Sequence, residues 1–455
     1  MLAGAAGLIG GNLFAIGNAR ASTVTRLTAA PGEHRFLPDQ AQASRLLQYN
    51  QSTPGPLLRL PQHQTTDIRF TNNLDEASSV HWHGLRIDNA MDGVADLTQP
   101  PVMPGESFLY RLTPPDAGTY WYHTHMRSWV QQALGLAGVL IVDEAEPPQV
   151  DHDLVCALDD WRLDDDLQFD RASLGALHDW AHEGRTGNVF TVNGKVLETY
   201  RVAAGERVRL RLVNIANSRV MNLLLHEAAA SVIAIDGQPV KPYPLEKGGI
   251  TLGPGGRMDL MIDMTGEPGQ ASLLEQVHRG YAYEVARFEY AASPKRNELL
   301  DTPIALPPNP LNAQNLPSDF KRVPLTMEGG AMGRMAEAEY QGQTMSLRDL
   351  ARQHSLVWAL NGIAGKPEEP LFRVPRGTAI SLETKNATRW PHAMHLHGHH
   401  VQYDRSPGIW RDTVLFDGQE SGAMQFVADN PGKWLIHCHM VEHMAGGMVT
   451  WFEVT

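Results

Sequence analysis

Three separate stretches of the chain alternate apolar and polar positions in one frame, and each ends in asparagine. They cover residues 60–72, 202–214 and 374–386 and read LPQHQTTDIRFTN, VAAGERVRLRLVN and VPRGTAISLETKN. Alternation with a period of two predicts a half-buried β-strand. A similar turn-containing lead precedes each stretch, YNQSTPGP, VNGKV and LNGIAGKP in that order. The pattern therefore predicts three copies of one β-rich unit.

The size of the chain and its glycine and proline content agree with this repeat. The chain has 455 residues, enough for several cores, and its 41 Gly and 30 Pro with few helical patterns favour short strands joined by turns. We predict an all-β protein of three consecutive β-sandwich domains. Their expected bounds are 22–146, 147–292 and 318–455, with a Pro- and Asn-rich linker at 293–317.

The outer two copies share histidine pairs that the middle copy lacks. Nine and eleven residues after the terminal asparagine, the first and third copies have histidine and the middle copy has leucine. A second shared element, DAGTYWYHTH or NPGKWLIHCH, closes each outer copy with another pair. The four His-x-His pairs are His81 with His83, His123 with His125, His395 with His397, and His437 with His439.

These pairs predict a shared metal site. Strand residues separated by one position project from the same face, so both imidazoles of a pair can aim at one place. For a single pair, two surface histidines would be the better explanation, but that explanation does not account for four pairs at duplicated offsets. Eight imidazoles exceed the ligands of one ion, so several metal ions are expected where the first and third domains meet.

A second kind of site is predicted on the opposite face of the strand that carries His437 and His439. In GKWLIHCHMVEHMAGGM, residues 432–448, Cys438 separates the two histidines of the last pair and so faces into its own domain. With His392, His443 and Met448 it offers a thiolate, two imidazoles and a thioether, the ligands of a blue-copper site. Structural zinc is the competing interpretation, but it favours a closed tetrahedron and leaves the other eight histidines unexplained.

Charge and the N-terminal segment bear on partners and location. The net charge of −13 argues against a nucleic-acid partner. Residues 1–21 are small and apolar and end in Ala-Arg-Ala, which predicts an exported, periplasmic or secreted, protein; the usual basic start is missing, and a buried strand is the alternative. No other apolar run is long enough to span a bilayer. Cys156 and Cys438 could form a disulfide, but Cys438 is better explained as a ligand and Cys156 as a buried thiol.

The motifs HWHG, WYHTH, HAMHLHG and HCHMVEHMAGGM resemble the four copper motifs of the three-domain multicopper oxidases, which include laccases and periplasmic cuprous oxidases. All four are complete, and the resemblance extends from about Ser22 to the end of the chain. It implies three cupredoxin-like Greek-key domains and four copper ions. It also implies four one-electron oxidations of a reductant coupled to reduction of dioxygen to two waters.

The resemblance also implies a role for each candidate ligand. Electrons would pass from Cys438 through its neighbouring histidines to a trinuclear cluster. The type 1 copper would be held by His392, Cys438, His443 and Met448, the type 2 copper by His81 and His395, and the type 3 pair by His83, His123 and His439 and by His125, His397 and His437.

Two carboxylates are candidates for proton supply. Asp92, in NAMDGV, matches a position where the family places an acid near the cluster, suited to general acid catalysis; a solvated turn residue is the alternative. Some bacterial members carry an acid directly after the second type 1 histidine. Here that residue is Met444, and Glu442 stands before the histidine instead.

The resemblance leaves two substrate classes, phenolic or similar aromatic reductants and Cu(I). Thioethers suit Cu(I), but methionines spaced three apart also pack one face of a helix. Thr388 and Trp390 stand where cuprous oxidases have an acid and a methionine, and Trp390 favours an aromatic substrate. We therefore predict a laccase-like enzyme, with a cuprous oxidase as the alternative. A scaffold that has lost copper is disfavoured because no ligand is missing. The methionines in question are Met327, Met332, Met335 and Met345.

Overall fold

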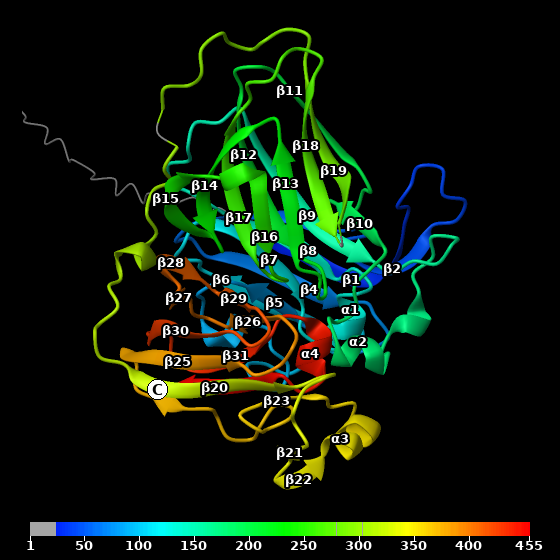
Figure 1. Cartoon of the computed structure of the whole chain (residues 1–455), viewed down its shortest axis with the longest axis vertical. Coiled ribbons are helices and arrows are strands. Elements are labelled where there is room, and N and C mark those ends of the chain that lie inside the picture. Colours follow the sequence, from blue (N-terminus) through cyan, green and yellow to red (C-terminus); the bar gives the residue numbers. More distant parts are fainter. Residues whose placement is uncertain (1–23, 279, 303) are drawn as a thin grey trace, which may run out of the picture.

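The computed structural model describes residues 24–278, 280–302 and 304–455, so the segment predicted to direct export lies outside the described residues. Strands make up most of the regular structure and form three two-sheet units, one from each third of the chain (Figure 1). The predicted all-β fold of three consecutive sandwich domains is confirmed. In the described part of the chain, no helix is long and apolar enough to cross a bilayer.

The first two domains are built from the following sheets, given in spatial order. The first domain has β2 (Ser44–Tyr49), β1 (Thr25–His34), β4 (Thr66–Asn72) and β6 (Ser107–Leu112) against β3 (Gly55–Pro61), β8 (Ala137–Asp143), β7 (Gly118–Thr124) and β5 (Val80–His83). The second has β10 (Val189–Val192), β9 (His152–Trp161), β12 (Arg207–Asn214), β17 (Arg257–Asp263), β14 (Ala229–Ile235) and β15 (Gln238–Pro244) against β11 (Glu198–Val202), β19 (Tyr281–Tyr290), β18 (Ala271–His278), β13 (Met221–His226) and β16 (Gly249–Leu252).

The third domain repeats this arrangement and adds a small hairpin. Its sheets are β23 (Trp358–Leu360), β20 (Lys321–Gly329), β25 (Thr378–Asn386), β30 (Ser421–Ala428), β27 (Val401–Tyr403) and β28 (Ser406–Arg411) against β24 (Arg373–Val374), β32 (Val449–Val454), β31 (Gly432–Cys438), β26 (His392–Leu396) and β29 (Thr413–Phe416), with the hairpin β21 (Glu337–Tyr340) and β22 (Gln343–Ser346). The helices are short: α1 (Ser128–Gln131), α2 (Leu177–Ala181), α3 (Leu347–His354), α4 (Val441–Ala445), and the 3₁₀ turns η1 (Asn89–Met91), η2 (Arg171–Ser173), η3 (Glu246–Gly248) and η4 (Pro310–Ala313).

The three alternating stretches of the sequence form equivalent strands. They are β4, β12 and β25, and each pairs in parallel with the first strand of its own domain, β1, β9 or β20. Their apolar positions fill the cores, as at Ile68, Leu210 and Leu382, which are all 0% exposed. The periodicity thus identified an interior strand of one sheet in each domain. The expectation of a half-buried strand is wrong for β12, because all of its residues are buried, including the arginines between the apolar positions.

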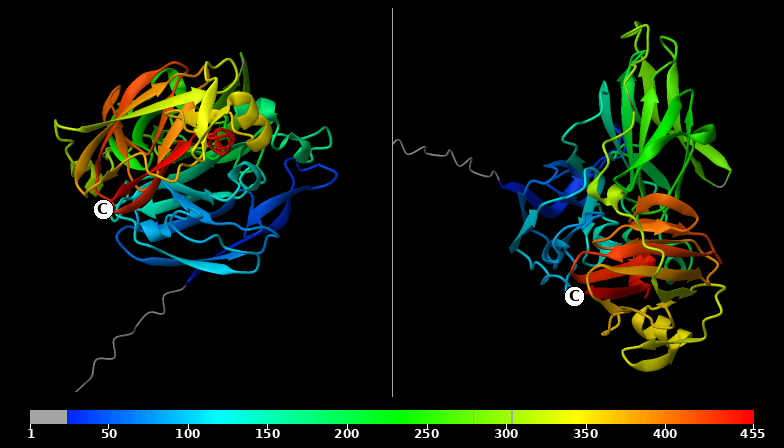
Figure 2. Two further views of the ribbon diagram at one scale, coloured as in Figure 1. Left: turned by 90° about the horizontal axis from the view of Figure 1, so that it is seen from below. Right: turned by 90° about the vertical axis from the view of Figure 1, so that its left-hand side faces the viewer.

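The domains pack so that each touches both others. β7 of the first domain contacts β12 and β17 of the second, β28 of the third contacts β14 and β15 of the second, and β31 of the third contacts η1 of the first. Figure 1 shows the middle domain in green above the orange and red third domain, and Figure 2 shows the blue first domain against both. The segment after β19 is bound to this junction, since the Asn309 side chain exchanges hydrogen bonds of 2.9 and 2.8 Å with the backbone of Ala117.

The methionine-rich stretch 327–345 is not a helix, so the interpretation of Met332 and Met335 as one helical face is wrong. Met327 lies in β20 in the main core of the third domain and is 0% exposed. Met335 and Met345 pack on a small core beside α3. Met332 lies in a turn with φ of 61° and is 68% exposed. Packing therefore explains three of the four side chains.

Candidate metal centre

Cys438 and two histidines meet in the core of the third domain. Cys438 Sγ lies 3.6 Å from His392 Nδ1 and 3.7 Å from His443 Nδ1, and these two nitrogens are 3.0 Å apart. All three side chains are 0% exposed. The outer nitrogens are already bonded: His392 Nε2 to Thr388 Oγ1 at 2.9 Å and His443 Nε2 to the His182 carbonyl at 2.8 Å. The inner Nδ1 atoms and the sulfur thus form a trigonal N₂S set.

Met448 closes the loop that carries these ligands. The amide of Cys438 donates to the Met448 carbonyl at 3.1 Å, and the amide of Met448 donates to the His443 carbonyl at 2.9 Å. Its side chain is 0% exposed and belongs to the same core as Cys438. Met448 thus lies in the same core and loop as the other predicted ligands and remains the candidate thioether ligand.

Burial sets the protonation states of the three side chains in this pocket. Burial raises the pKa of the Cys438 thiol to about 12 and lowers the pKa of His443 to about 3. The imidazoles are therefore neutral with available lone pairs, while the sulfur keeps its proton until a cation displaces it. Metal binding here should release a proton.

The eight histidines of the four pairs converge at the contact between the first and third domains. Strand pairing sets His81 opposite His123 in β5 and β7, and His395 opposite His437 in β26 and β31. Across the interface, the rings of His83 and His395 stack with centroids 3.8 Å apart, as do those of His81 and His397 at 3.9 Å. Candidate ligand atoms lie within 4.8 Å of one another in four groups: His81, His83 and His123; His81, His395 and His397; His125, His397 and His437; and His83, His395 and Asp412.

His439 lies at the edge of this cluster. Its ring centroid is 4.8 Å from that of His83 and 5.2 Å from that of His123, the two histidines with which the sequence groups it. On the opposite side of the same strand, Cys438 faces its own domain, as the alternation predicted. One strand end therefore contributes to both sites.

The cluster contains buried nitrogens that have no hydrogen-bond partner in the described part of the chain. Buried polar atoms are ordinarily hydrogen-bonded. Yet several ring nitrogens have no partner among the described residues, namely Nε2 of His81, His123, His125 and His395, Nδ1 of His83, and both nitrogens of His439. Burial also lowers the pKa of His83, His123, His125, His395, His397, His437 and His439, so these rings are neutral. Unpaired neutral imidazoles around one point fit metal ions.

Hydrogen bonds to the backbone fix which nitrogen faces the centre. Nδ1 of His81, His123, His395 and His437 bonds to the carbonyl oxygens of Asp92, Thr124, Asp412 and Cys438 at 2.8, 2.8, 2.9 and 2.9 Å. This leaves Nε2 of each ring directed inward. Such partners orient a metal-ligating ring before the ion arrives.

Comparison with known proteins decides the family. Models of the multicopper oxidases match residues 32–147, 152–274 and 336–455, which together cover most of the chain. The chain belongs to the multicopper oxidase family. Its relatives include multicopper oxidase MmcO of Mycobacterium tuberculosis, 29% identical over 89% of this chain and 82% of that protein, and Laccase-2 of Fomitopsis schrenkii, 28% identical over 87% and 83%.

Solved structures agree with this assignment. The multi-copper oxidase of Pseudomonas thermotolerans has a TM-score of 0.81 at 32% identity, covering 94% of this chain and 98% of that one. Lac15 from a marine microbial metagenome has a TM-score of 0.75 at 35% identity, covering 95% and 100%. The three domains are therefore cupredoxin-like, and the oxidase is a copper enzyme that uses dioxygen as electron acceptor.

Asp92 joins the first and third domains at the cluster of the oxidase. Its carboxylate accepts from His397 Nδ1 at 2.9 Å, and its backbone oxygen accepts from His81 at 2.8 Å. The side chain is 1% exposed, so the alternative of a solvated turn residue is wrong. Gly93, with φ of 86°, lets this turn pack against β5, since a Cβ there would lie 1.8 Å from the Val80 carbonyl oxygen.

The middle domain also contributes to the cluster of the oxidase, which sequence reasoning missed. A Cβ on Gly255 would lie 2.9 Å from His83 Cε1, so the turn before β17 touches the imidazoles directly. Arg257 follows this turn and binds Asp412, which in turn binds His83. Residues 253–257 read GPGGR and have no histidine nearby in the sequence. Only the packing of the domains shows that they lie beside the histidine cluster.

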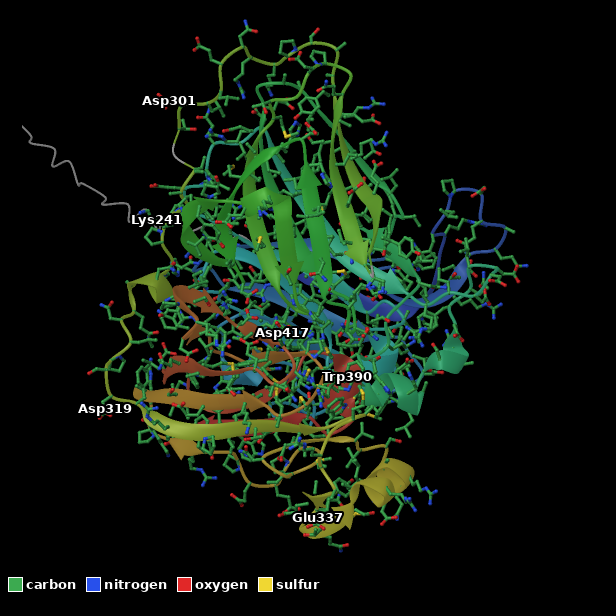
Figure 3. All side chains as sticks on the ribbon, viewed as in Figure 1. Lys241, Asp301, Asp319, Glu337, Trp390 and Asp417 are labelled. Atoms are coloured by element: carbon green, nitrogen blue, oxygen red, sulfur yellow. The ribbon has the colours of Figure 1, made fainter. Side chains whose placement is uncertain are left out.

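A segment of the middle domain covers the site formed by His392, Cys438 and His443, called the thiolate site below. The His182 carbonyl bonds His443, and the ring of His182 lies 5.0 Å from that of Trp390, which is labelled in Figure 3. The ring of Trp358 packs against that of His443, with centroids 4.5 Å apart, and its indole nitrogen donates to the Trp180 carbonyl at 2.7 Å. His182 and Trp390 are thus partly exposed side chains beside the buried His443.

Proposed function

We propose that this oxidase binds four copper ions and couples the one-electron oxidation of phenolic reductants to reduction of dioxygen to two waters. The observation that carries the proposal is the pair of adjoining sites, a buried N₂S set and a cluster of unpaired imidazoles, linked through one strand end. The type 1 ligands would be His392, Cys438, His443 and Met448; the type 2 ligands His81 and His395; and the type 3 ligands His83, His123 and His439, with His125, His397 and His437.

Copper held by these residues supplies reversible one-electron chemistry. The protein contributes a short covalent route, since Cys438 is bonded through the backbone to His437 on one side and His439 on the other. Four phenols each lose one electron and one proton, and one dioxygen takes up four of each. Buried Asp92, fixed against His397, is the candidate proton donor on the cluster side.

An aromatic reductant is supported by the surface over the thiolate site. Trp390 is half-buried and its indole nitrogen donates to the Ala331 carbonyl at 3.0 Å, so the ring is held in place beside His182. A fixed ring beside a partly exposed imidazole can stack a flat phenol. A laccase-like oxidase named CueO from Ochrobactrum sp., 25% identical, is described as active on lignin model compounds and lignosulfonate.

A cuprous oxidase in copper tolerance is the second candidate. Within the stretch proposed for Cu(I), only Met332 presents an exposed thioether, and a single soft ligand binds weakly.

We further propose that the protein is exported, on the basis of the Ala-Arg-Ala motif at residues 19–21.

The test compares initial oxygen uptake with 2,6-dimethoxyphenol and with Cu(I) on copper-loaded protein, with the Trp390→Ala variant beside the parent. We expect faster turnover with the phenol, and at least a threefold higher KM for the phenol in the variant. Oxygen uptake with Cu(I) alone would replace the proposal by copper detoxification, and no uptake with either would point to a scaffold.

A further inference from the structure

Arg257 is a fully buried arginine of the middle domain that reaches the histidine cluster of the other two domains. It is 0% exposed and grips Asp412 of the third domain with two hydrogen bonds, Nη1 to Oδ1 at 2.7 Å and Nη2 to Oδ2 at 2.5 Å. Its own amide donates to Asp236 Oδ1 at 2.9 Å. A two-pronged bond of this kind fixes the plane of the carboxylate as well as its position.

Asp412 passes this orientation to one ring of the cluster. Its Oδ1 lies 3.0 Å from His83 Nε2 and 2.8 Å from Thr413 Oγ1, and its backbone oxygen accepts from His395 Nδ1 at 2.9 Å. Both carboxylate oxygens of Asp412 accept from the Arg257 guanidinium, and Oδ1 also accepts from Thr413 Oγ1. A carboxylate paired in this way with an arginine acts only as a hydrogen-bond acceptor.

The direction of this bond fixes the tautomer of His83. Because Asp412 must accept, His83 carries its proton on Nε2 and keeps the lone pair on Nδ1. That Nδ1 is the buried nitrogen that has no partner among the described residues. His81, His123, His395 and His437 present Nε2 instead, so His83 differs from them in the atom that it offers.

We propose that Arg257 is a positioning residue that, through Asp412, holds His83 in the Nε2–H tautomer and so makes Nδ1 a metal ligand. The inference rests on the proposed copper set. It gives the middle domain, which provides no ligand, control over one ligand atom of the cluster. Gly84 preserves the arrangement, since a Cβ there would lie 2.4 Å from the Arg257 guanidinium and 2.6 Å from the Asp412 carboxylate.

The first test needs no variant. In copper-free protein labelled with [¹⁵N]histidine, ring-nitrogen chemical shifts report the tautomer, and the His83 signals are assigned as those missing from His83→Gln. We expect the Nε2–H form at pH 7. An Nδ1–H form would overturn the proposal.

The second test compares Arg257→Lys with Arg209→Lys. Arg209 is 1% exposed and donates twice to Asp259 of the same domain, and neither side chain hydrogen-bonds a histidine of the cluster in the described part of the chain, so it is a matched control for a buried arginine–aspartate pair. Lysine keeps the positive charge but cannot donate two parallel hydrogen bonds from a planar group. We expect Arg257→Lys to lose about one copper per chain and keep its blue absorption, while Arg209→Lys keeps full copper loading.

The outcomes of this comparison separate the two proposals. Failure of the parent to load copper would refute the proposed function. Full loading of both variants, or equal copper loss in both, would refute the role of Arg257 and leave the function standing. Thermal unfolding curves of each copper-free variant verify that both variants are folded at the temperature of copper loading.

Discussion

Gly255 offers the sharpest test of the middle domain's part in the cluster. The residue has φ of 83°, and a Cβ there would lie 2.9 Å from His83 Cε1 and 3.1 Å from His439 Cγ. Gly269 is in the same domain with φ of 81° and has nothing within 4 Å of its would-be Cβ. Alanine at either position strains the backbone equally, but only at Gly255 does it press on imidazoles.

The expected magnitudes follow from these distances. The left-handed backbone costs alanine about 1–2 kcal/mol, so both variants should lose stability by that amount. Carbon atoms in ordinary contact are roughly 3.5–4.0 Å apart, so the two rings must recede by about 0.5–1 Å in Gly255→Ala. A misplacement of about 1 Å can reduce a rate by roughly 100-fold. We expect at least a tenfold loss of oxygen uptake in Gly255→Ala alone.

The assay measures thermal unfolding, copper content, blue absorbance and oxygen uptake for both variants and the parent. The account predicts that Gly255→Ala keeps its blue absorbance, because the thiolate site is untouched, but loses turnover. Equal turnover in Gly255→Ala and Gly269→Ala would refute the reasoning that the turn before β17 supports the cluster.

Three further predictions follow. Cys438→Ser should abolish the blue absorbance and turnover, whereas Cys156→Ser, which alters an equally buried thiol in the middle domain, should keep both; blue colour in the first variant would contradict the ligand assignment. Replacing Met327, Met332, Met335 and Met345 together with Leu should leave the rates of Cu(I) and phenol oxidation within about twofold of the parent, because three of the four side chains are packing residues and Leu nearly conserves the volume of Met. A selective tenfold fall in the Cu(I) rate would instead favour the cuprous oxidase function. Burial lowers the pKa of His123 and His437, so below the ordinary value of about 6.5 the unfolded chain binds more protons than the folded one, and stability falls by up to about 1.4 kcal/mol per pH unit for each such histidine. The unfolding midpoint of copper-free protein should therefore drop by on the order of 10 °C from pH 7 to pH 5, and a constant midpoint would show that these rings are not buried neutral.

The sequence was sufficient for the fold class and for the meeting of the histidine pairs at the contact between the first and third domains. Period-two alternation identified β4, β12 and β25 because each has one fully buried face, and the offsets of the His-x-His pairs followed from the repeat. The opposite orientation of Cys438 and His437 followed from the same alternation. These features are local to a strand or are repeated along the chain, so one sequence contains them.

Contacts between domains could not be predicted in the same way. Gly255 and Arg257 lie more than 150 residues from Asp412 and from His83 or His439, and no local pattern marks a glycine as a neighbour of a histidine ring. The His182 cap over His443 was missed for the same reason. The methionine stretch misled because a spacing of three fits a helix, while Gly329, Gly330 and Gly333 break it into turns.

The most direct test of the central claim is a paired measurement on the loaded parent: copper per chain, and phenol oxidised per dioxygen consumed. The account predicts four copper ions per chain and four phenols oxidised per dioxygen, with no hydrogen peroxide released. One copper per chain, or two phenols per dioxygen with peroxide, would show that the imidazole cluster does not act as the site of four-electron reduction.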